Sequence, residues 1–537
     1  MKRYHGADVS ALSGAFRSKN SPGASCLALL AIATLTSIVY GRRLTDVPAY
    51  IGGDEAYFAT HAYAIATTGR DLNGHALPVL FNITDPLIQN DSGIWYQPML
   101  VYVIALVLKF RSLTEWTIRL PMVMIGVVNA LLMYAVARRI FSSVVLGALA
   151  ALILVLTPAH FLFCRQTVDY VCPLPFVLAW LWCVIRFHDT RETRWLTFGG
   201  ALLGVGLFSY VASWVMMPFY LALTLLVVGQ SPEQRARRVW ATGLGFALPL
   251  LVLLPWLWFH WNAVGEVVAR YRIHESSGVI RRLAVFWQYF DPAYLFFSGS
   301  AHPTQSTRTA GIFPLASSAL LIAGILYLWR DRRAPVNRLL LIGFVCAPLA
   351  VVAAMPADPF STGRGLYVLP FGVLISMFGV VRFRSAPAAG LRAIAVLLLL
   401  GVPLQFWSFL RDYYSGYRTT SAMRFDATNF RAVAEYVIAS DTSTSVPAVY
   451  LSRDLDDGGI RWKFYLLRYR RDDLWVRTHS FSPTENHLTD AERGSLLVLY
   501  PQNPRLRQLI ERDGWVLAKV VFDISGAQSA MILRKGA

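Results

Sequence analysis

The chain has 537 residues, of which 55% are hydrophobic and only 15% are charged, and its mean hydropathy is +0.46. A soluble domain usually carries about 25% charged residues, so this composition excludes an ordinary soluble protein. The net charge is +18, but the Lys and Arg residues lie at the ends of apolar runs and form no separate basic stripe. That distribution is typical of membrane topology and argues against nucleic-acid binding. The five cysteines contain no CxxC pair, so neither a disulfide framework nor a cysteine metal site is expected.

Eleven apolar runs predict transmembrane helices. The first run, 26–40, follows several basic residues and has no small-x-small cleavage site behind it. It is therefore expected to be a retained helix with its N-terminus in the cytoplasm. The later predicted spans are 120–137, 144–163, 173–187, 195–211, 215–228, 240–261, 312–329, 339–355, 366–381 and 391–410.

Basic residues indicate the orientation of these spans. With a cytoplasmic N-terminus, every even-numbered connection is short and carries arginines, from Arg138 and Arg139 in the first to Arg382 and Arg384 in the last. The positive-inside rule then places the first loop, the loop 263–311 and the C-terminal region outside. A short apolar run ending at Phe110 is expected to be an interfacial helix, because a span there would reverse every later basic cluster.

The C-terminal region turns polar at about Asp412. Alternating patterns predict a small α/β domain over 411–537, after a transmembrane module over 1–410. Strands are expected at 446–451, 495–500, 515–523 and 530–533, and helices at 460–469 and 504–512. No catalytic motif is found in this region.

Two adjacent carboxylates, Asp54 and Glu55, closely follow the first apolar run. They begin a stretch of helical period with Tyr57 and His61, which predicts a helix lying along the membrane surface. A carboxylate at the bilayer boundary is costly unless it is hydrated, paired or used, and partial desolvation tunes a general base. Asp54 is therefore interpreted either as a general base or as an acid that caps the helix.

Charged residues also mark the outer ends of later spans. Arg165 and Asp169 are four residues apart, so on a helix they would share one face, either as an interfacial ion pair or as part of a site near the first-loop acids. Arg364 and Tyr367 open the tenth span from outside, against the positive-inside bias. The Arg364 guanidinium suits a phosphate oxygen, unless it merely snorkels to lipid headgroups.

Arginines also occur in the long external loop, where Arg270 and Arg272 would bind a polyanionic ligand or anionic lipid. Acids and arginines from four external segments thus gather at one membrane face. That distribution suits a site for an amphipathic substrate that contains phosphate. The sequence has no Walker loop, GxSxG motif, HExxH motif or internal repeat, which argues against an ATP-driven pump and a membrane metalloprotease.

The run Asp54-Glu55-Ala56-Tyr57-Phe58 resembles the acidic motif of the GT-C glycosyltransferases, and in particular the protein mannosyltransferase and aminoarabinose-transferase group. The similarity covers roughly residues 25 to 410. Many relatives carry Lys before the proline-containing motif of the first loop, where this chain has Tyr96 and Gln97. Further matching segments are 98–100, 119–121, 138–141, 165–169 and 364–370.

The resemblance implies a mainly α, polytopic GT-C fold of about eleven spans, with interfacial helices in the first external loop. It also implies a mechanism. Such enzymes take a sugar from a polyprenyl-phosphate donor, and an acceptor hydroxyl attacks the anomeric carbon with inversion. By this resemblance Asp54 is the general base, Glu55 supports it or binds the acceptor, and Asp169 is a second acid of the site.

The same resemblance assigns Arg364 to the donor phosphate, with Arg165 and Tyr367 also expected to bind it. Tyr57, His61, Arg270 and Arg272 are candidates for further substrate binding. No resident cofactor is certain, although paired acids can bind a divalent cation.

The partners expected are a polyprenyl-phosphate sugar, membrane lipids and an acceptor. The acceptor is left open between lipid A or another glycolipid, a polysaccharide and a protein, and the sugar is not named. A bacterial inner membrane with the site facing the periplasm is expected. Other hypotheses are a lipid-linked glycan flippase or transporter, a non-catalytic assembly subunit and a polymer ligase.

Overall fold

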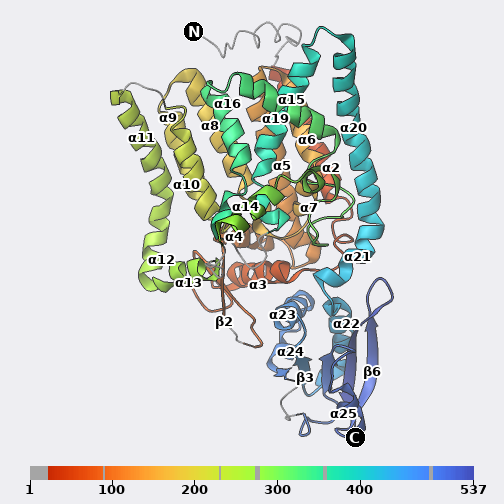
Figure 1. Cartoon of the computed structure of the whole chain (residues 1–537). Coiled ribbons are helices and arrows are strands. Elements are labelled where there is room, and N and C mark those ends of the chain that lie inside the picture. The colour runs from red at the N-terminus through yellow and green to blue at the C-terminus, as the bar shows by residue number, and fades with distance from the viewer. Residues whose placement is uncertain are drawn as a thin grey trace. The chain divides into compact units, whose positions relative to one another are not determined.

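The computed structural model describes residues 22–536 except 89–90, 229–231, 272–277, 355–359 and 483–487. The described chain is mainly helical (Figure 1). Its helices up to residue 414 are α2 (Pro22–Gly41), α3 (Gly53–Thr68), α4 (Pro98–Leu108), α5 (Glu115–Phe141), α6 (Val144–Val155), α7 (Pro158–Phe163), α8 (Leu174–Thr190), α9 (Arg194–Gly206), α10 (Ser213–Thr224), α11 (Pro232–Ala247), α12 (Leu253–Phe259), α13 (Asn262–Tyr271), α14 (Val279–Gln288), α15 (Ala316–Arg330), α16 (Pro335–Val345), α17 (Leu349–Ala354), α18 (Thr362–Gly365), α19 (Val368–Arg384) and α20 (Ala389–Tyr414).

Five helical segments among the described residues are long and apolar enough to cross a membrane. Together with shorter apolar helices they make the chain a multi-pass membrane protein. The long segments are Pro22–Gly41, Glu115–Phe141, Asp169–Thr190, Gln234–Phe259 and Ala389–Tyr414.

Each predicted apolar run contains at least one helix, but two of the runs are interrupted and a third changes its helix type. The run 144–163 is split between α6 and α7 at Pro158, which has no amide hydrogen to continue the helix. The run 339–355 is split before α17 at Pro348, and the run 240–261 passes through a 3-10 turn at Leu248–Val252. The prediction of one continuous helix is therefore wrong for 144–163 and 339–355, where proline breaks the hydrogen-bond ladder. The residues Gln234–Phe259 stay one helical segment that is long enough to cross a membrane.

The chain forms two compact units. The first unit contains the segment that ends at Arg42, together with Gln97–Leu100 and Met122–Asp412. The second unit contains Arg43–Tyr96, Val101–Pro121 and the C-terminal segment from Tyr413. The first loop thus packs with the C-terminal region, whereas the predicted domain boundary at 410 stays a prediction.

In the first unit, α19 is buried from Val368 to Val380 and packs against α15 (Figure 1). Two glycines allow the backbones to meet: a Cβ at Gly324 would overlap the carbonyl oxygen of Ile375, and a Cβ at Gly379 would overlap that of Leu320. Close approach at small residues is the usual way in which helices associate in membranes, where lipid tails remove the hydrophobic driving force.

The C-terminal part of the second unit is built around a five-stranded sheet with the order β4-β3-β5-β7-β6. The strands β4, β3 and β5 are parallel, and β7 is antiparallel to both β5 and β6. The strands are β3 (Val449–Ser452), β4 (Thr478–Phe481), β5 (Leu496–Leu499), β6 (Trp515–Phe522) and β7 (Gln528–Lys535). The helices are α21 (Gly416–Phe425), α22 (Phe430–Ser440), α23 (Gly458–Tyr469), α24 (Asp472–Val476) and α25 (Leu506–Glu511).

The four strands and two helices predicted for this region are found within a few residues of their expected positions. The sequence interpretation missed the short strand β4 and the helices α21, α22 and α24. The sequence of α22 carries a readable signal, because Asn429 caps it and Phe430, Val433 and Val437 form its buried face.

Candidate functional site

Asp54 lies in the first turn of α3 and is exposed. The hydroxyl of Tyr96 donates a hydrogen bond to its carboxylate. Tyr96 ends β2 (Asp91–Tyr96), which pairs with β1 (Phe81–Thr84) in a hairpin, and its ring stacks on Phe58 of α3 at 4.3 Å between centroids. The hairpin therefore orients an exposed carboxylate, which is not the N-cap residue of the helix, since that residue is Gly52.

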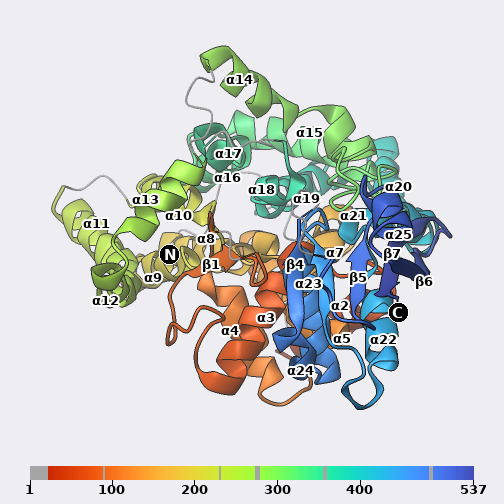
Figure 2. The same ribbon diagram turned by 90° about the horizontal axis from the view of Figure 1, so that it is seen from below.

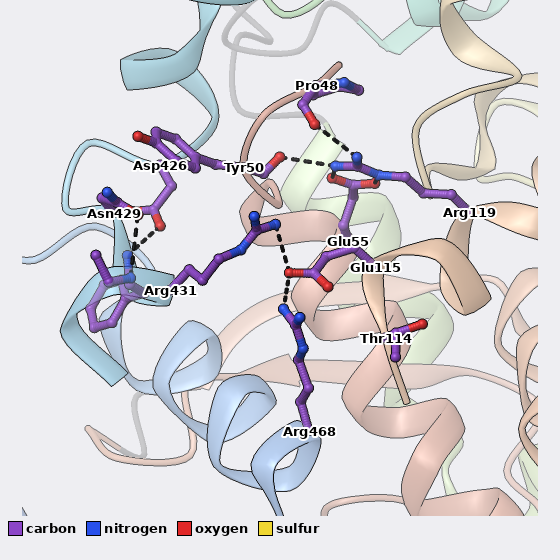
Figure 3. Close-up of polar contacts among 12 residues, drawn as sticks. Pro48, Tyr50, Glu55, Thr114, Glu115, Arg119, Asp426, Asn429, Arg431 and Arg468 are labelled. Atoms are coloured by element: carbon purple, nitrogen blue, oxygen red, sulfur yellow. Dashed lines mark hydrogen bonds and ion pairs between the residues drawn. The ribbon is translucent and has the colours of Figure 1, made fainter. Parts of the chain in front are cut away.

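The adjacent residue Glu55 has the opposite environment, with 1% of its side chain exposed. One carboxylate oxygen accepts from Arg119 Nε at 2.9 Å, and the other accepts from Arg119 Nη2 at 2.9 Å and from the backbone N–H of Gly52 at 3.0 Å (Figure 3). This is a bidentate pair, the strongest geometry for an Arg–carboxylate interaction. Glu55 therefore fixes the start of α3, immediately beside Asp54.

Arg119 uses its remaining N–H groups on the segment that precedes α3. Its Nη1 donates to the carbonyl oxygens of Leu44 (3.1 Å) and Pro48 (2.8 Å), and its Nη2 donates to that of Tyr50 (2.9 Å). All five donors of the guanidinium thus have acceptors, as a buried cation requires. The residue anchors both the helix and the chain that leads into it.

One helical turn before Arg119, Glu115 binds two arginines of the C-terminal region (Figure 3). Arg431 of α22 lies 2.7 Å from the carboxylate, and Arg468 of α23 also contacts it. The Glu115 side chain is 4% exposed, whereas those of Arg431 and Arg468 are 31% and 23% exposed. This cluster ties α22 and α23 to the first turn of α5, within the second unit.

Tyr57 and His61 are both buried on α3. Burial raises the pKa of Tyr57, and the carboxylates of Asp457 and Asp85 act in the same direction. Burial lowers the pKa of His61 to about 4, so its ring is neutral at neutral pH; it packs edge-on against Phe81 at 5.4 Å. Their roles in substrate binding stay predictions.

Other parts of the chain cover much of α3. Residues 55–62 of α3 are buried at every position, so α3 has no continuous exposed face in this stretch. The predicted position of α3 along the membrane surface stays a prediction.

The remaining predicted residues lie in the first unit. Arg165 follows the end of α7 at Phe163, and the chain is not helical from there to Asp169. The prediction that Arg165 and Asp169 share a helix face is therefore wrong. Arg165 is fully buried, and its Nη1 donates to the carbonyl oxygens of Tyr40 and Arg42, the latter at 2.8 Å.

Asp169 is 5% exposed and begins a 3-10 turn, Asp169–Val171, which packs against α18. A Cβ at Gly363 of α18 would overlap the ring of Tyr170, so the backbone of α18 passes directly over this turn. Arg364, the next residue, is half-buried. The first unit thus brings the segments that carry Asp169 and Arg364 together, although they are about 200 residues apart in the sequence.

Polar contacts hold α18 in this position. The side-chain oxygen of Gln305 accepts from Ser361 Oγ at 2.9 Å and from the backbone N–H of Thr362 at 2.8 Å. Tyr367 is the N-cap residue of α19, the next helix, and its hydroxyl is 2.9 Å from Ser213 Oγ. Both α18 and the start of α19 are therefore fixed by side chains from other parts of the first unit.

The last two candidate residues, Arg270 and Arg272, are two positions apart in the sequence. Arg270 lies in α13, and Arg272 lies outside the described residues. Within the described ranges, no group of three or more His, Cys, Asp or Glu side chains is arranged to hold a metal ion. Binding of a divalent cation by the paired acids stays a prediction.

The predicted residues fall into two groups, one in each compact unit. Asp54, Glu55, Tyr57 and His61 lie in the second unit, and the phosphate-binding candidates and Asp169 lie in the first. Convergence of the two groups on one substrate stays a prediction. Sequence reasoning missed the pairing of Arg119 with Glu55 and the bond from Tyr96 to Asp54, because both join residues far apart in the sequence.

Comparison with known proteins identifies the class of fold. Residues 96–259 match the family model of the dolichyl-phosphate-mannose-protein mannosyltransferases. No curated protein matches the chain. These findings and the structural comparisons below confirm the resemblance to the GT-C glycosyltransferases.

Two crystal structures of ArnT from Cupriavidus metallidurans have the same fold. The apo structure has a TM-score of 0.59 and 14% identity, and the alignment covers 94% of this chain and 97% of ArnT. The structure bound to undecaprenyl phosphate has a TM-score of 0.59 and 15% identity, and covers 95% and 98%. At this identity the similarity establishes the fold over nearly the whole length of both chains.

Proposed function

We propose that this chain is a glycosyltransferase that moves a sugar from a polyprenyl-phosphate donor to a hydroxyl acceptor. The observation that carries the proposal is the contrast between two adjacent acids. Glu55 is buried in a bidentate pair with Arg119, while Asp54 is exposed and oriented by Tyr96. A general base needs such a fixed but accessible carboxylate.

The fold supports a donor of this class. The similar ArnT was crystallised with undecaprenyl phosphate, and the matching family model describes transferases that use dolichyl-phosphate mannose. In the proposed reaction the acceptor oxygen bonds to the anomeric carbon while the bond from that carbon to the phosphate oxygen breaks. The hydroxyl proton passes to Asp54, and the configuration inverts.

Arg364 is proposed to stabilise the charge that develops on the leaving phosphate. It is half-buried and lies on a short helix that polar contacts hold in place. Arg165 and Tyr367 are fully buried and already bonded, so a supporting role behind Arg364 suits them better than direct contact with phosphate. Asp169 is proposed as the second acid of the site.

The finer features of the chain belong to the same proposal. We expect eleven spans in a bacterial inner membrane, with the first loop and the C-terminal domain on the periplasmic side. The acceptor is a glycolipid such as lipid A, a polysaccharide or a protein. Whether a divalent cation takes part is decided by assaying transfer before and after EDTA treatment.

The test is glycosyl transfer by the purified chain in liposomes, with a panel of undecaprenyl-phosphate sugars. Asp54→Asn is expected to fold normally but to transfer sugar at least ~100-fold more slowly, as for loss of a general base. Tyr96→Phe removes only the hydroxyl that orients Asp54 and keeps the stacked ring, so a smaller loss is expected.

Asp46→Asn is the matched control, because Asp46 is a half-exposed carboxylate of the same segment, paired only locally with Arg43 at 2.8 Å. It should transfer sugar at the wild-type rate. Equal rates for Asp54→Asn and the wild type would remove Asp54 from the mechanism. If the wild type consumes no donor in a panel that covers the common bacterial lipid-linked sugars, the transferase proposal fails.

A further inference from the structure

The C-terminal domain has an arrangement of strands that usually marks a functional edge. β3 lies between β4 and β5, the next two strands in the sequence. The chain therefore runs from β3 to β4 on one side and then crosses back past β3 to β5 on the other side. In open α/β sheets, functional residues gather in the crevice beyond the carboxyl end of the strand at such a switch point. The segment that follows β3 there contains Asp456 and Asp457, directly before α23.

This edge packs against α3, and α23 and α3 lie side by side (Figure 2). Two glycines make the contact. A Cβ at Gly53, the first residue of α3, would overlap the carboxylate of Asp457. A Cβ at Gly459 of α23 would overlap the carboxylate of Asp85 from the first loop.

Each helix therefore receives a carboxylate from the other segment at its N-terminus, where the partial positive charge of the helix favours an anion. The contact is reciprocal, and it brings the C-terminal domain to within one residue of Asp54. Capping of the N-terminus of α3 would explain the position of Asp457. It would not explain why further carboxylates lie close to Asp457, since like charges repel one another.

Several charged and titratable side chains lie close to Asp457. Asp54 and Tyr57 face it from α3, Asp85 from the first loop, and Asp456 and Arg461 from its own segment. Arg461 lies 3.7 Å away and also donates to the carbonyl oxygens of Phe425 and Asp456, so its charge is shared. Burial, with the repulsion of the neighbouring acids, raises the pKa of Asp457 to about 6.

We propose that Asp457 is a positioning residue for the transfer reaction, supplied by the C-terminal domain, whose negative charge beside the first turn of α3 makes Asp54 a stronger proton acceptor. The inference rests on the proposed function. Electrostatic repulsion is mutual, so the effect of Asp54 on Asp457 implies an equal effect of Asp457 on the proton affinity of Asp54. The C-terminal domain thereby acts on the proposed base through one residue, Asp457.

The experiment measures kcat/KM between pH 4.5 and 8.5 for the wild type and three variants. Asp457→Asn removes the charge, and its acidic limb is expected to move down by roughly 0.5 to 1 pH unit, the size expected for one nearby charge in partly solvated surroundings. Its plateau should fall about 3- to 10-fold, because a weaker base transfers the proton less readily.

Two variants control for structural effects. Asp457→Glu keeps the charge and should retain the wild-type limb. Asp454→Asn removes a charge from the same segment, at an exposed residue hydrogen-bonded to Asn503 at 3.1 Å, and should leave both the limb and the plateau unchanged. If Asp457→Asn does not shift the acidic limb of the pH profile of kcat/KM, the proposal is overturned, even if the rate falls.

A second measurement needs no turnover. Because folding raises the pKa of Asp457 from its unfolded value near ~4 to about 6, this carboxyl stabilises the fold below that unfolded value and loses the effect as pH rises to 6. The melting temperature of the wild type minus that of Asp457→Asn should therefore fall between pH 4 and 7. The fall should be smaller in an Asp54→Asn background.

The two measurements separate the possible failures. If the wild type transfers no sugar, the proposed function fails, while the melting temperatures still report the coupling between the two acids. If the fall in melting temperature is the same with and without Asp54, the two acids are not coupled and the inference is wrong.

Discussion

At the scale of single residues, the first turn of α3 places two adjacent acids in different environments. Successive helical residues point about 100° apart, so Asp54 and Glu55 cannot share an environment. Glu55 turns toward Arg119 and is buried, while Asp54 turns toward Tyr96 and stays exposed. The sequence identified both acids from their position after the first span, but not which of them is anchored, because Arg119 follows 64 residues after Glu55.

Arg119→Met should destabilise the second unit strongly. It leaves Glu55 buried without its partner, which typically costs about 3 to 5 kcal/mol. The comparison is Arg507→Met, which removes an exposed pair with Glu511 that is worth at most about 1 kcal/mol. Thermal unfolding in detergent should show a much larger loss for Arg119→Met, whereas similar melting temperatures would mean that the buried pair does not anchor α3.

At the scale of secondary-structure elements, the sequence predicted where helices occur but not where each helix begins and ends. Every predicted apolar run contains a helix, because apolar side chains and internally satisfied backbone groups favour helices in lipid. The interruptions at Pro158 and Pro348 follow from the missing amide hydrogen of proline. The contact of α15 with α19 was not predictable, because single glycines do not reveal which helix they face.

The packing of α15 against α19 should tolerate no side chain at Gly324 or Gly379. Gly324→Ala or Gly379→Ala inserts a Cβ into a backbone carbonyl of the other helix, and such overpacking typically costs about 1 to 3 kcal/mol or more. Gly243→Ala in α11 is the matched control, since a Cβ there meets no described atom within 4 Å. Size-exclusion profiles and melting temperatures should be impaired for the first two variants and unchanged for the third; equal behaviour of all three would contradict this packing.

At the scale of the whole molecule, the first loop and the C-terminal region form one compact unit although about 300 residues separate them. Glu115 with its two arginines and the Gly53–Asp457 contact join them. The compact unit that carries Asp54 is therefore built from parts of the chain that the sequence presents as a loop and a tail. The predicted topology of eleven spans concerns the same scale and rests on the basic residues in the connections.

Reporter fusions test that topology. Alkaline phosphatase fused after Gly536 should be active and a green fluorescent protein there should be dark, because eleven spans place the C-terminus outside. Fusions in the connection that contains Arg139 should show the reverse. A fluorescent C-terminal fusion would mean an even number of spans, and the first loop would then need a new assignment.

The sequence by itself determined the membrane class, the helical runs and four strands of the C-terminal region, and it singled out Asp54 and Glu55 as candidate site residues. These follow from local properties: apolar length, alternation, and charge near the end of a span. Only the tertiary structure decided that Arg119 holds Glu55, that Tyr96 orients Asp54, and that Asp457 lies against the same helix turn. Such contacts join residues 42 to about 400 positions apart, and no local pattern records which distant partner satisfies a buried charge.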